Sequence, residues 1–229
     1  MTDLEPGHCA FKDLCLDANS AKNAAGFWAP ALGLRAERKG DDCVLTDDVD
    51  EHTLWINTVP EPPTVKNRVH LDVITGAVAD LVALGARVID ELPKWTVLAD
   101  REGGEFCAFV RPPEELNSYR LLELVVDSAD PGAIARWWAD RFGVTPRQSD
   151  HGGFRWLEDV PRMPWEMVFH RVPEPKAVKN RVHWDVLGVT AEFLAVGATR
   201  YAGPVDPANA WDVLVDPEGN EFCVFAPSA

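Results

Sequence analysis

Apolar and polar residues alternate with a period of two along residues 69–73, which predicts a β-strand with one buried face. The strand lies in a segment, residues 59–73, that returns almost unchanged 113 positions later. Its apolar face carries Val69, Leu71 and Val73, and its polar face carries Arg68, His70 and Asp72. In the second copy the polar positions hold Arg181, His183 and Asp185. A polar row on a strand that also packs a core is costly unless it lines a groove or a site, so we expect function there.

The rest of each half predicts the same order of elements around this central strand. A strand at residues 10–17, in which Phe11 falls out of phase, precedes a helix that Asn19 or Ser20 caps and Gly33 ends. Shorter strands, a second helix and a closing hairpin follow at 43–46, 53–59, 78–84 and 95–109. The second half repeats the series at 121–127, 131–142, 153–157, 166–172, 191–196 and 211–225. Each half therefore contains two βαβββ units, and the pattern leaves open which units share a sheet.

The composition of the chain limits the classes of partner that the protein could bind. Over 229 residues the net charge is −15, which argues against nucleic acid and against an anionic membrane surface. We find neither a signal peptide nor an apolar stretch long enough to span a bilayer. The five cysteines lack metal-clip spacing and suit reduced thiols in the cytoplasm. We expect a cytoplasmic monomer or homodimer whose partner is a small molecule.

Several motifs resemble the vicinal oxygen chelate superfamily, and most closely its glyoxalase-like branch in tandem. The matching segments are 27–28, 67–72, 84–86 and 100–106, with 137–138, 180–185, 196–198 and 216–222 in the second copy. The resemblance implies an α+β fold of two tandem glyoxalase-like domains, each of two βαβββ units that form curled, cup-shaped mixed sheets. We place the domains at residues 1–112 and 119–229, with a linker at 113–118.

Catalytic members of this superfamily hold a divalent metal inside the cup, and the resemblance implies which positions would do so here. The expected groups are Asp13, His70 and Cys107 in one half and Glu123, His183 and Cys223 in the other. Both copies depart from the family pattern, since a cysteine stands where the last-strand glutamate is expected. Glu105 and Glu221 lie two residues earlier on the same face and are the candidate catalytic carboxylates.

The mixed donor set suits zinc or another first-row metal such as nickel, manganese or iron. The alternative is that the metal has been lost, so that the histidines belong to a buried polar network and the cysteines are small core residues. The missing glutamate favours this loss.

Other polar residues on the same faces are candidates for ligand binding. Arg68 and Arg181 could clamp an anion, or instead pair with Asp72 and Asp185 or lock the preceding loop. Asn57 and His170 match across the repeat and are expected to face a cup, and Trp55 could form an aromatic wall or pack within the sheet.

The sequence supports two functions of different classes, and it gives less support to a third. The first is an enzyme, a metal-assisted lyase or isomerase in which a cup carboxylate moves a proton. The second is a metal-free protein that sequesters an aromatic or hydrophobic natural product. The third is an interaction module whose cup is filled by its own aromatic residues.

Overall fold

The computed structural model describes residues 8–149, 153–203, 205 and 208–227. The first half contains β1 (Ala10–Ala18), α1 (Ala21–Leu32), β2 (Arg35–Lys39), β3 (Asp42–Thr46), β4 (Leu54–Thr58), β5 (Val69–Thr75), α2 (Val78–Ala83), β6 (Arg87–Glu91), β7 (Thr96–Ala99) and β8 (Glu105–Val110). The second half contains β9 (Leu121–Ser128), α3 (Pro131–Phe142), β10 (Arg147–Gln148), β11 (Phe154–Leu157), β12 (Glu166–Arg171), β13 (Val182–Leu187), α4 (Thr190–Ala195), β14 (Thr199–Arg200), β15 (Asp212–Val215) and β16 (Glu221–Phe225). Short 3-10 turns lie at Asp50–His52 and Pro113–Glu115.

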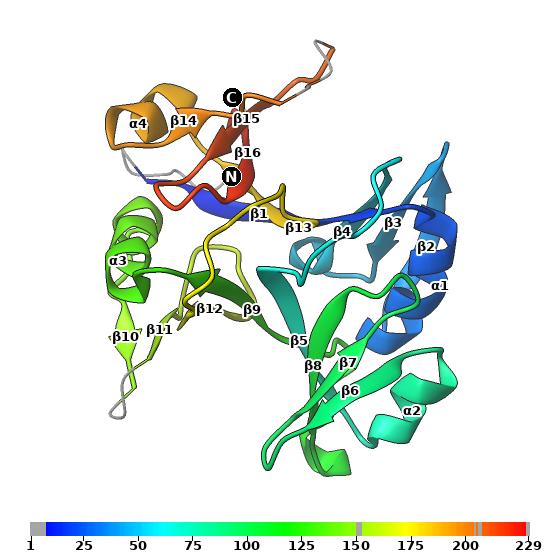
Figure 1. Ribbon diagram of the computed structural model, residues 1–229. Coiled ribbons are helices and arrows are strands. Elements are labelled where there is room, and N and C mark those ends of the chain that lie inside the picture. The colour runs from blue at the N-terminus through cyan, green and yellow to red at the C-terminus, as the bar shows by residue number, and fades with distance from the viewer. Residues whose placement is uncertain (1–7, 150–152, 204, 206–207, 228–229) are drawn as a thin grey trace.

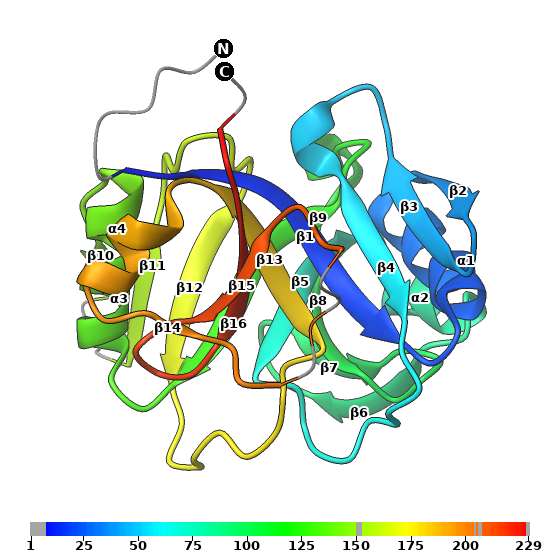
Figure 2. The same ribbon diagram turned by 90° about the horizontal axis from the view of Figure 1, so that it is seen from above.

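The strands form two eight-stranded mixed sheets, and each sheet takes one βαβββ unit from each half of the chain. The first sheet has the order β14-β15-β16-β13-β1-β4-β3-β2, and the second has the order β10-β11-β12-β9-β5-β8-β7-β6. The units join through two antiparallel pairs, β1 with β13 and β5 with β9. Helices α1 and α2 flank one side of the molecule, and α3 and α4 flank the opposite side (Figures 1 and 2). The expected curled α+β fold is therefore confirmed, and its sheets connect the two halves.

The predicted boundaries of α1 and α3 agree with the structure because local capping fixes them. The hydroxyl of Ser20 accepts a hydrogen bond from the backbone N–H of Asn23, and Gly33 ends α1 with a φ of 75°. A side chain at Gly33 would also meet the carbonyl oxygen of Ser118 at 1.8 Å. Both the positive φ and this close contact therefore require glycine there. In α3 the carboxylate of Asp130 caps the helix. Among the described residues no helix is long and apolar enough to cross a membrane.

Aromatic side chains join the two sheets within each half. Trp28 of α1, which follows β1 of the first sheet, packs against Phe106 of β8 in the second sheet, with ring centroids 5.1 Å apart. Trp138 of α3 makes the equivalent contact with Phe222 of β16 at 4.9 Å. Both indole N–H groups donate to an aspartate of a closing hairpin. These contacts join the two sheets within each half, and one hydrophobic core continues through both halves.

A carboxylate in the turn of the closing hairpin strengthens this connection in each half. Glu218, in the hairpin between β15 and β16, accepts hydrogen bonds from the backbone N–H groups of Ala129 and Asp130 and from the Ser128 hydroxyl. These groups lie at the start of α3, where backbone donors are otherwise unsatisfied. In the first half, Glu102 accepts from the backbone N–H groups of Asn19 and Ser20 at 2.7 and 2.8 Å.

The alternation of apolar and polar residues did not predict the outer strands β2 and β6. Every residue of both strands is exposed, so neither carries the apolar face that alternation detects. Their position at a sheet edge explains this exposure, because charged side chains there oppose edge-to-edge association.

Replacing Glu218 by glutamine should lower the free energy of unfolding by about 1 to 2 kcal/mol. The substitution weakens three hydrogen bonds to an ionised acceptor while keeping the shape of the side chain. Chemical denaturation measures the change, and Glu114→Gln, at an exposed position of the linker, serves as the control. Equal stability of the two variants would show that this carboxylate does not connect the units.

Candidate functional site

The central strands β5 and β13 present their two faces to different surroundings, as the alternation predicts. On β13, Val182, Trp184 and Val186 are buried in the core, and Trp184 packs against Trp138 of α3 at 5.1 Å. His183 and Asp185 point the other way, into a cavity on the first sheet, and His70 and Asp72 of β5 line a cavity on the second. We call these cavities the first cup, of about 450 Å³, and the second cup, of about 550 Å³.

The expected grouping of metal ligands by half is wrong, because each cup is shared between the halves. Asp13 of β1 lies in the first sheet beside Asp185, whereas His70 and Cys107 lie in the second sheet. Glu123 of β9 lies in the second sheet, where it pairs with Asp72 of β5. The sheets thus exchange the expected partners, since Asp13 shares a sheet with His183 and Cys223, and Glu123 shares one with His70 and Cys107. In the first cup Cys15, and not Asp13, lies with His183 in the lining.

In the second cup, polar groups converge on the central strands. His70 Nε2 lies 3.2 Å from Asp72 Oδ1 and 3.8 Å from Cys107 Sγ. The donor atoms of these three residues all lie within 4.8 Å of one another. The carboxyl group of Glu123 completes the cluster from the neighbouring strand, directly opposite Asp72.

Two acids face each other across β5 and β9, which changes the protonation of Glu123. Burial and the neighbouring Asp72 carboxylate raise the pKa of Glu123 to about 8. Burial and Asp72 also raise the pKa of the Cys107 thiol well above its usual range. At neutral pH the cluster therefore holds protons that a bound cation would displace.

Aromatic side chains stand on both sides of this acidic floor. Trp95, just before β7, and Phe109 of β8 are 5.9 Å apart on one side. On the other side Phe154 of β11 stacks on His170 of β12 at 4.5 Å, and Trp156 lies beside them in the cavity wall. The acidic groups that line the second cup are Asp72, Glu105, Glu123, Asp127 and Glu166.

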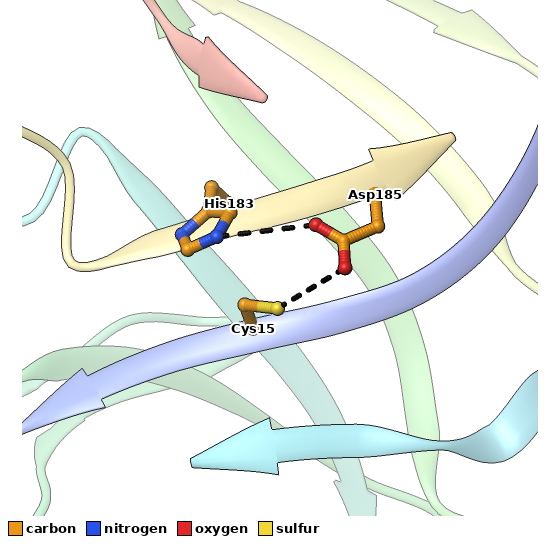
Figure 3. A group of neighbouring side chains, drawn as sticks. All are labelled: Cys15, His183 and Asp185. Carbon is orange, nitrogen blue, oxygen red and sulfur yellow. Dashed lines mark hydrogen bonds and ion pairs between the residues drawn. The ribbon is translucent and has the colours of Figure 1, made fainter. Parts of the chain in front are cut away.

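The first cup has the same scaffold and a different lining. Cys15 Sγ donates to Asp185 Oδ2 at 3.5 Å, and His183 Nε2 lies 4.0 Å from Asp185 Oδ1 (Figure 3). Burial raises the pKa of Asp185 to about 7 and lowers that of His183 to about 4, so the imidazole is neutral at neutral pH. Lys12 lies 4.3 Å above the ring of Phe225, within the cup wall.

A second aspartate in each cup was not among the predicted site residues. Asp127 lies 3.1 Å from Lys66 Nζ and 3.8 Å from His170 Nδ1. Burial raises the pKa of Asp127, but the hydrogen bond to His170 and the charge of Lys66 outweigh it, so the net shift is downward. The first cup repeats this arrangement with Asp17, Lys179 and Asn57. The repeated Lys-Asn-Arg sequence contained the signal, because Lys66 and Lys179 occupy the same position in both copies.

The two arginines of the repeat bind backbone carbonyl groups. Neither lines a cup in the described part of the chain. Arg68 donates to the carbonyl oxygens of Glu174 and Asp127, at 2.6 and 2.8 Å. Arg181 donates to the carbonyl oxygen of Glu61 at 2.7 Å and lies 3.5 Å from the Glu102 carboxylate. Each arginine therefore reaches the other copy of its own segment. The arginines therefore hold the loop of the other copy, whereas the expectation was that each would lock the loop that precedes its own strand.

The remaining candidates are placed as follows. Trp55 and Asn57 of β4 line the first cup, and His170 lines the second. Glu105 lines the second cup. Glu221 lines the first, but its oxygens accept from Lys176 and from the backbone N–H of Asn180. The catalytic roles of Glu105 and Glu221 stay predictions.

Comparisons with known proteins agree on the fold. A family model for the glyoxalase-like domain matches residues 13–109 and again residues 123–225. Glyoxalase I from Zea mays is similar in structure, with a TM-score of 0.65 and 12% sequence identity over 94% of this chain and 92% of that one. A putative dioxygenase from Bacillus subtilis has a TM-score of 0.61 and 11% identity over 96% of this chain and 86% of that one. No curated protein matches the chain. At these identities the likeness to solved structures concerns the fold alone.

The raised pKa of Glu123 predicts that stability falls as the pH rises. Its pKa is about 8 in the folded protein against an ordinary value of 4.5, so between these values the folded state binds more protons than the unfolded one. Between pH 6 and pH 8 the free energy of unfolding should therefore drop by about 1 to 2 kcal/mol more in the natural protein than in Glu123→Gln. Denaturation at a series of pH values measures this difference, and parallel profiles would contradict it.

Proposed function

Because the chain belongs to the glyoxalase-like domain family, whose fold it shares in both halves, we propose that it binds a small, flat, cationic molecule in the second cup. The observation that carries the proposal is the combination of facing aromatic walls with a carboxylate-rich floor in one cavity of about 550 Å³. That volume falls within the usual range of small-molecule pockets.

The walls favour a flat ligand. Aromatic side chains contribute from both ends of the second sheet, Trp95 and Phe109 from the β7–β8 hairpin and Phe154 and Trp156 from β11. A planar ring placed between them would replace water on both of its faces and stack against the indoles. An interaction module with a self-filled cup is disfavoured, since the aromatic side chains surround a cavity in the second cup.

The floor favours a positive charge. Five carboxyl groups line the second cup, against one lysine and no arginine among its described lining residues. Glu123 holds a proton at neutral pH, and Asp127 is paired with Lys66. Asp72, Glu105 and Glu166 remain to face a cation. A cation between aromatic faces gains further stabilisation from the ring quadrupoles. The net charge of −15 would also draw cations towards the protein.

A second candidate function, a metal-assisted lyase or isomerase, rests on the convergence of His70, Asp72 and Cys107. The donor atoms lie close enough together to share one ion, and an imidazole, a carboxylate and a thiolate suit zinc or another first-row metal. A divalent metal held by these residues would polarise adjacent oxygens of a substrate. Glu105 or Glu123, which line the same cavity, would move the proton.

Ligand binding can be tested with ethidium, a planar aromatic cation, beside neutral phenanthridine and the anion 1-anilinonaphthalene-8-sulfonate. Ethidium should bind at one molecule per chain and quench tryptophan fluorescence, with an affinity at least about tenfold above that of the anion. Trp156→Ala and Asp72→Asn should each weaken binding about tenfold or more. Trp55→Ala is the matched control, because Trp55 lies in the other cup. Equal binding of cation and anion, or a loss confined to Trp55→Ala, would contradict the proposal.

The metal candidate is tested by elemental analysis of protein purified without a metal-binding tag and then incubated with zinc, manganese, nickel or iron(II). One metal per chain that is lost in His70→Ala and in Cys107→Ala, and kept in His52→Gln, would support it. His52 is a suitable control because it stacks on Tyr119 at 3.8 Å, away from the described lining of both cups. Metal that is unaffected by His70→Ala and Cys107→Ala would exclude this site.

A further inference from the structure

An imidazole and a buried carboxylate stand side by side at one end of the second cup. His170 of β12 pairs with Asp127 of β9 in the parallel ladder, and both side chains line the cavity. Nδ1 of His170 lies 3.8 Å from Oδ1 of Asp127, whose side chain is 4% exposed. The corresponding residue of the first cup is Asn57, which pairs with Asp17 and cannot exchange a proton at neutral pH. The two cups therefore differ at this position in the ability to move protons.

The surroundings hold the imidazole of His170 in one orientation. Its ring stacks on Phe154 of β11, with ring centroids 4.5 Å apart and an angle of 12° between the planes. Because Nδ1 faces the acceptor Asp127, the proton of the neutral ring belongs on Nδ1 and the lone pair on Nε2. The side chain of His170 is 42% exposed and lines the cavity, so Nε2 can reach a water molecule there.

A lysine supplies positive charge at the same end of the cup. Nζ of Lys66 lies 3.1 Å from Oδ2 of Asp127, the other oxygen of the same carboxylate. This contact uses one of the three N–H groups of the ammonium, so two remain to face an oxygen atom of a bound molecule. A base, the acid that orients it and a cationic donor thus meet in one cavity. The addition of water to a carbonyl group requires this combination.

From this geometry we infer that the second cup hydrolyses a carboxylic ester carried by a planar aromatic cation. His170 is the general base, Asp127 is the residue that positions it, and Lys66 faces the oxygen on which negative charge develops. The inference rests on the proposed function for the nature of the substrate, because the aromatic walls and the acidic floor hold the cationic ring. The hydrolytic group itself is assigned from the contacts of His170 alone.

Each turnover consumes one water molecule and returns the protein to its starting state. Nε2 of His170 takes a proton from water, and the water oxygen forms a bond to the acyl carbon. The electron pair of the carbonyl bond moves to its oxygen, which Lys66 stabilises. The bond from the acyl carbon to the alcohol oxygen then breaks, and this oxygen takes the proton from Nε2. The products are a carboxylic acid and an alcohol, and nothing is oxidised or reduced.

The activity can be tested with 7-acetoxy-1-methylquinolinium, a planar cation whose hydrolysis releases a fluorescent product, beside the neutral ester 4-methylumbelliferyl acetate. Turnover should be catalytic, with a kcat/KM for the cation at least about tenfold above that for the neutral ester. His170→Asn, which introduces the residue of the first cup, should lower kcat about 100-fold and leave KM nearly unchanged. His52→Gln is the matched control, because His52 lies outside the described lining of both cups. It should keep full activity.

Two further variants separate catalysis from a structural role. Imidazole added to His170→Gly should restore part of the lost activity, which a residue needed only for folding would not allow. Asp127→Asn should lower kcat about tenfold or more with KM nearly unchanged, because an amide does not fix the tautomer of His170. Circular dichroism confirms the fold of each variant. Should Asp127→Asn fail to fold, the rescue of His170→Gly still decides the role of the imidazole.

Equal turnover by His170→Asn and the natural protein would overturn the inference. Binding of the cationic ester in competition with ethidium, without turnover, would also overturn it and would leave the proposed function intact. Turnover of both esters at equal rates that depends on His170, together with no binding of ethidium, would support the hydrolytic group and contradict the proposed cationic ligand. The two proposals therefore fail separately.

Discussion

The antiparallel pairing of β5 with β9, and of β1 with β13, is the constraint on which the rest of the structure depends. These pairs are the places where the two halves of the chain become one sheet, and each central strand contributes one face to the core and the other to a cup. A slip of one residue would move His70 and Asp72 into the core and Leu71 into the cavity. The register of two strands therefore fixes the chemistry of both cups.

The cross-connections of the repeated segment hold that register. Arg68 reaches the carbonyl of Glu174 and Arg181 reaches that of Glu61, so each copy anchors the loop of the other. Lys66 and Lys179 add ion pairs that also run from one half to the other. The close similarity of the two segments thus has an explanation in folding, since each copy must fit a partner of the same shape, and it does not require two identical active sites.

Local order could be predicted from the sequence, whereas the composition of each cup could not. Ser20 and Gly33 fix the ends of α1 by capping, and the alternation correctly predicted that one face of each central strand is buried and the other lines a cavity. The grouping of Asp13 with His70 was wrong because pairing between units is non-local and alternation carries no information about it. Cys15 was missed for a different reason. The family pattern pointed to Asp13, two residues earlier, whereas Cys15 is the residue of β1 that pairs with His183 and lines the first cup.

The same architecture explains how two cups on one scaffold can acquire different chemistry. The core that joins the sheets lies on the opposite face of every central strand, so a change on a cup face leaves the core packing intact. Val125 and Cys15 occupy equivalent places opposite a histidine, yet one adds an apolar side chain to the second cup and the other adds a thiol that donates to Asp185 in the first. Because no strand is shared between the sheets, each such change acts on one cup alone. A duplicated fold of this kind can therefore change the lining of one cavity without changing the lining of the other.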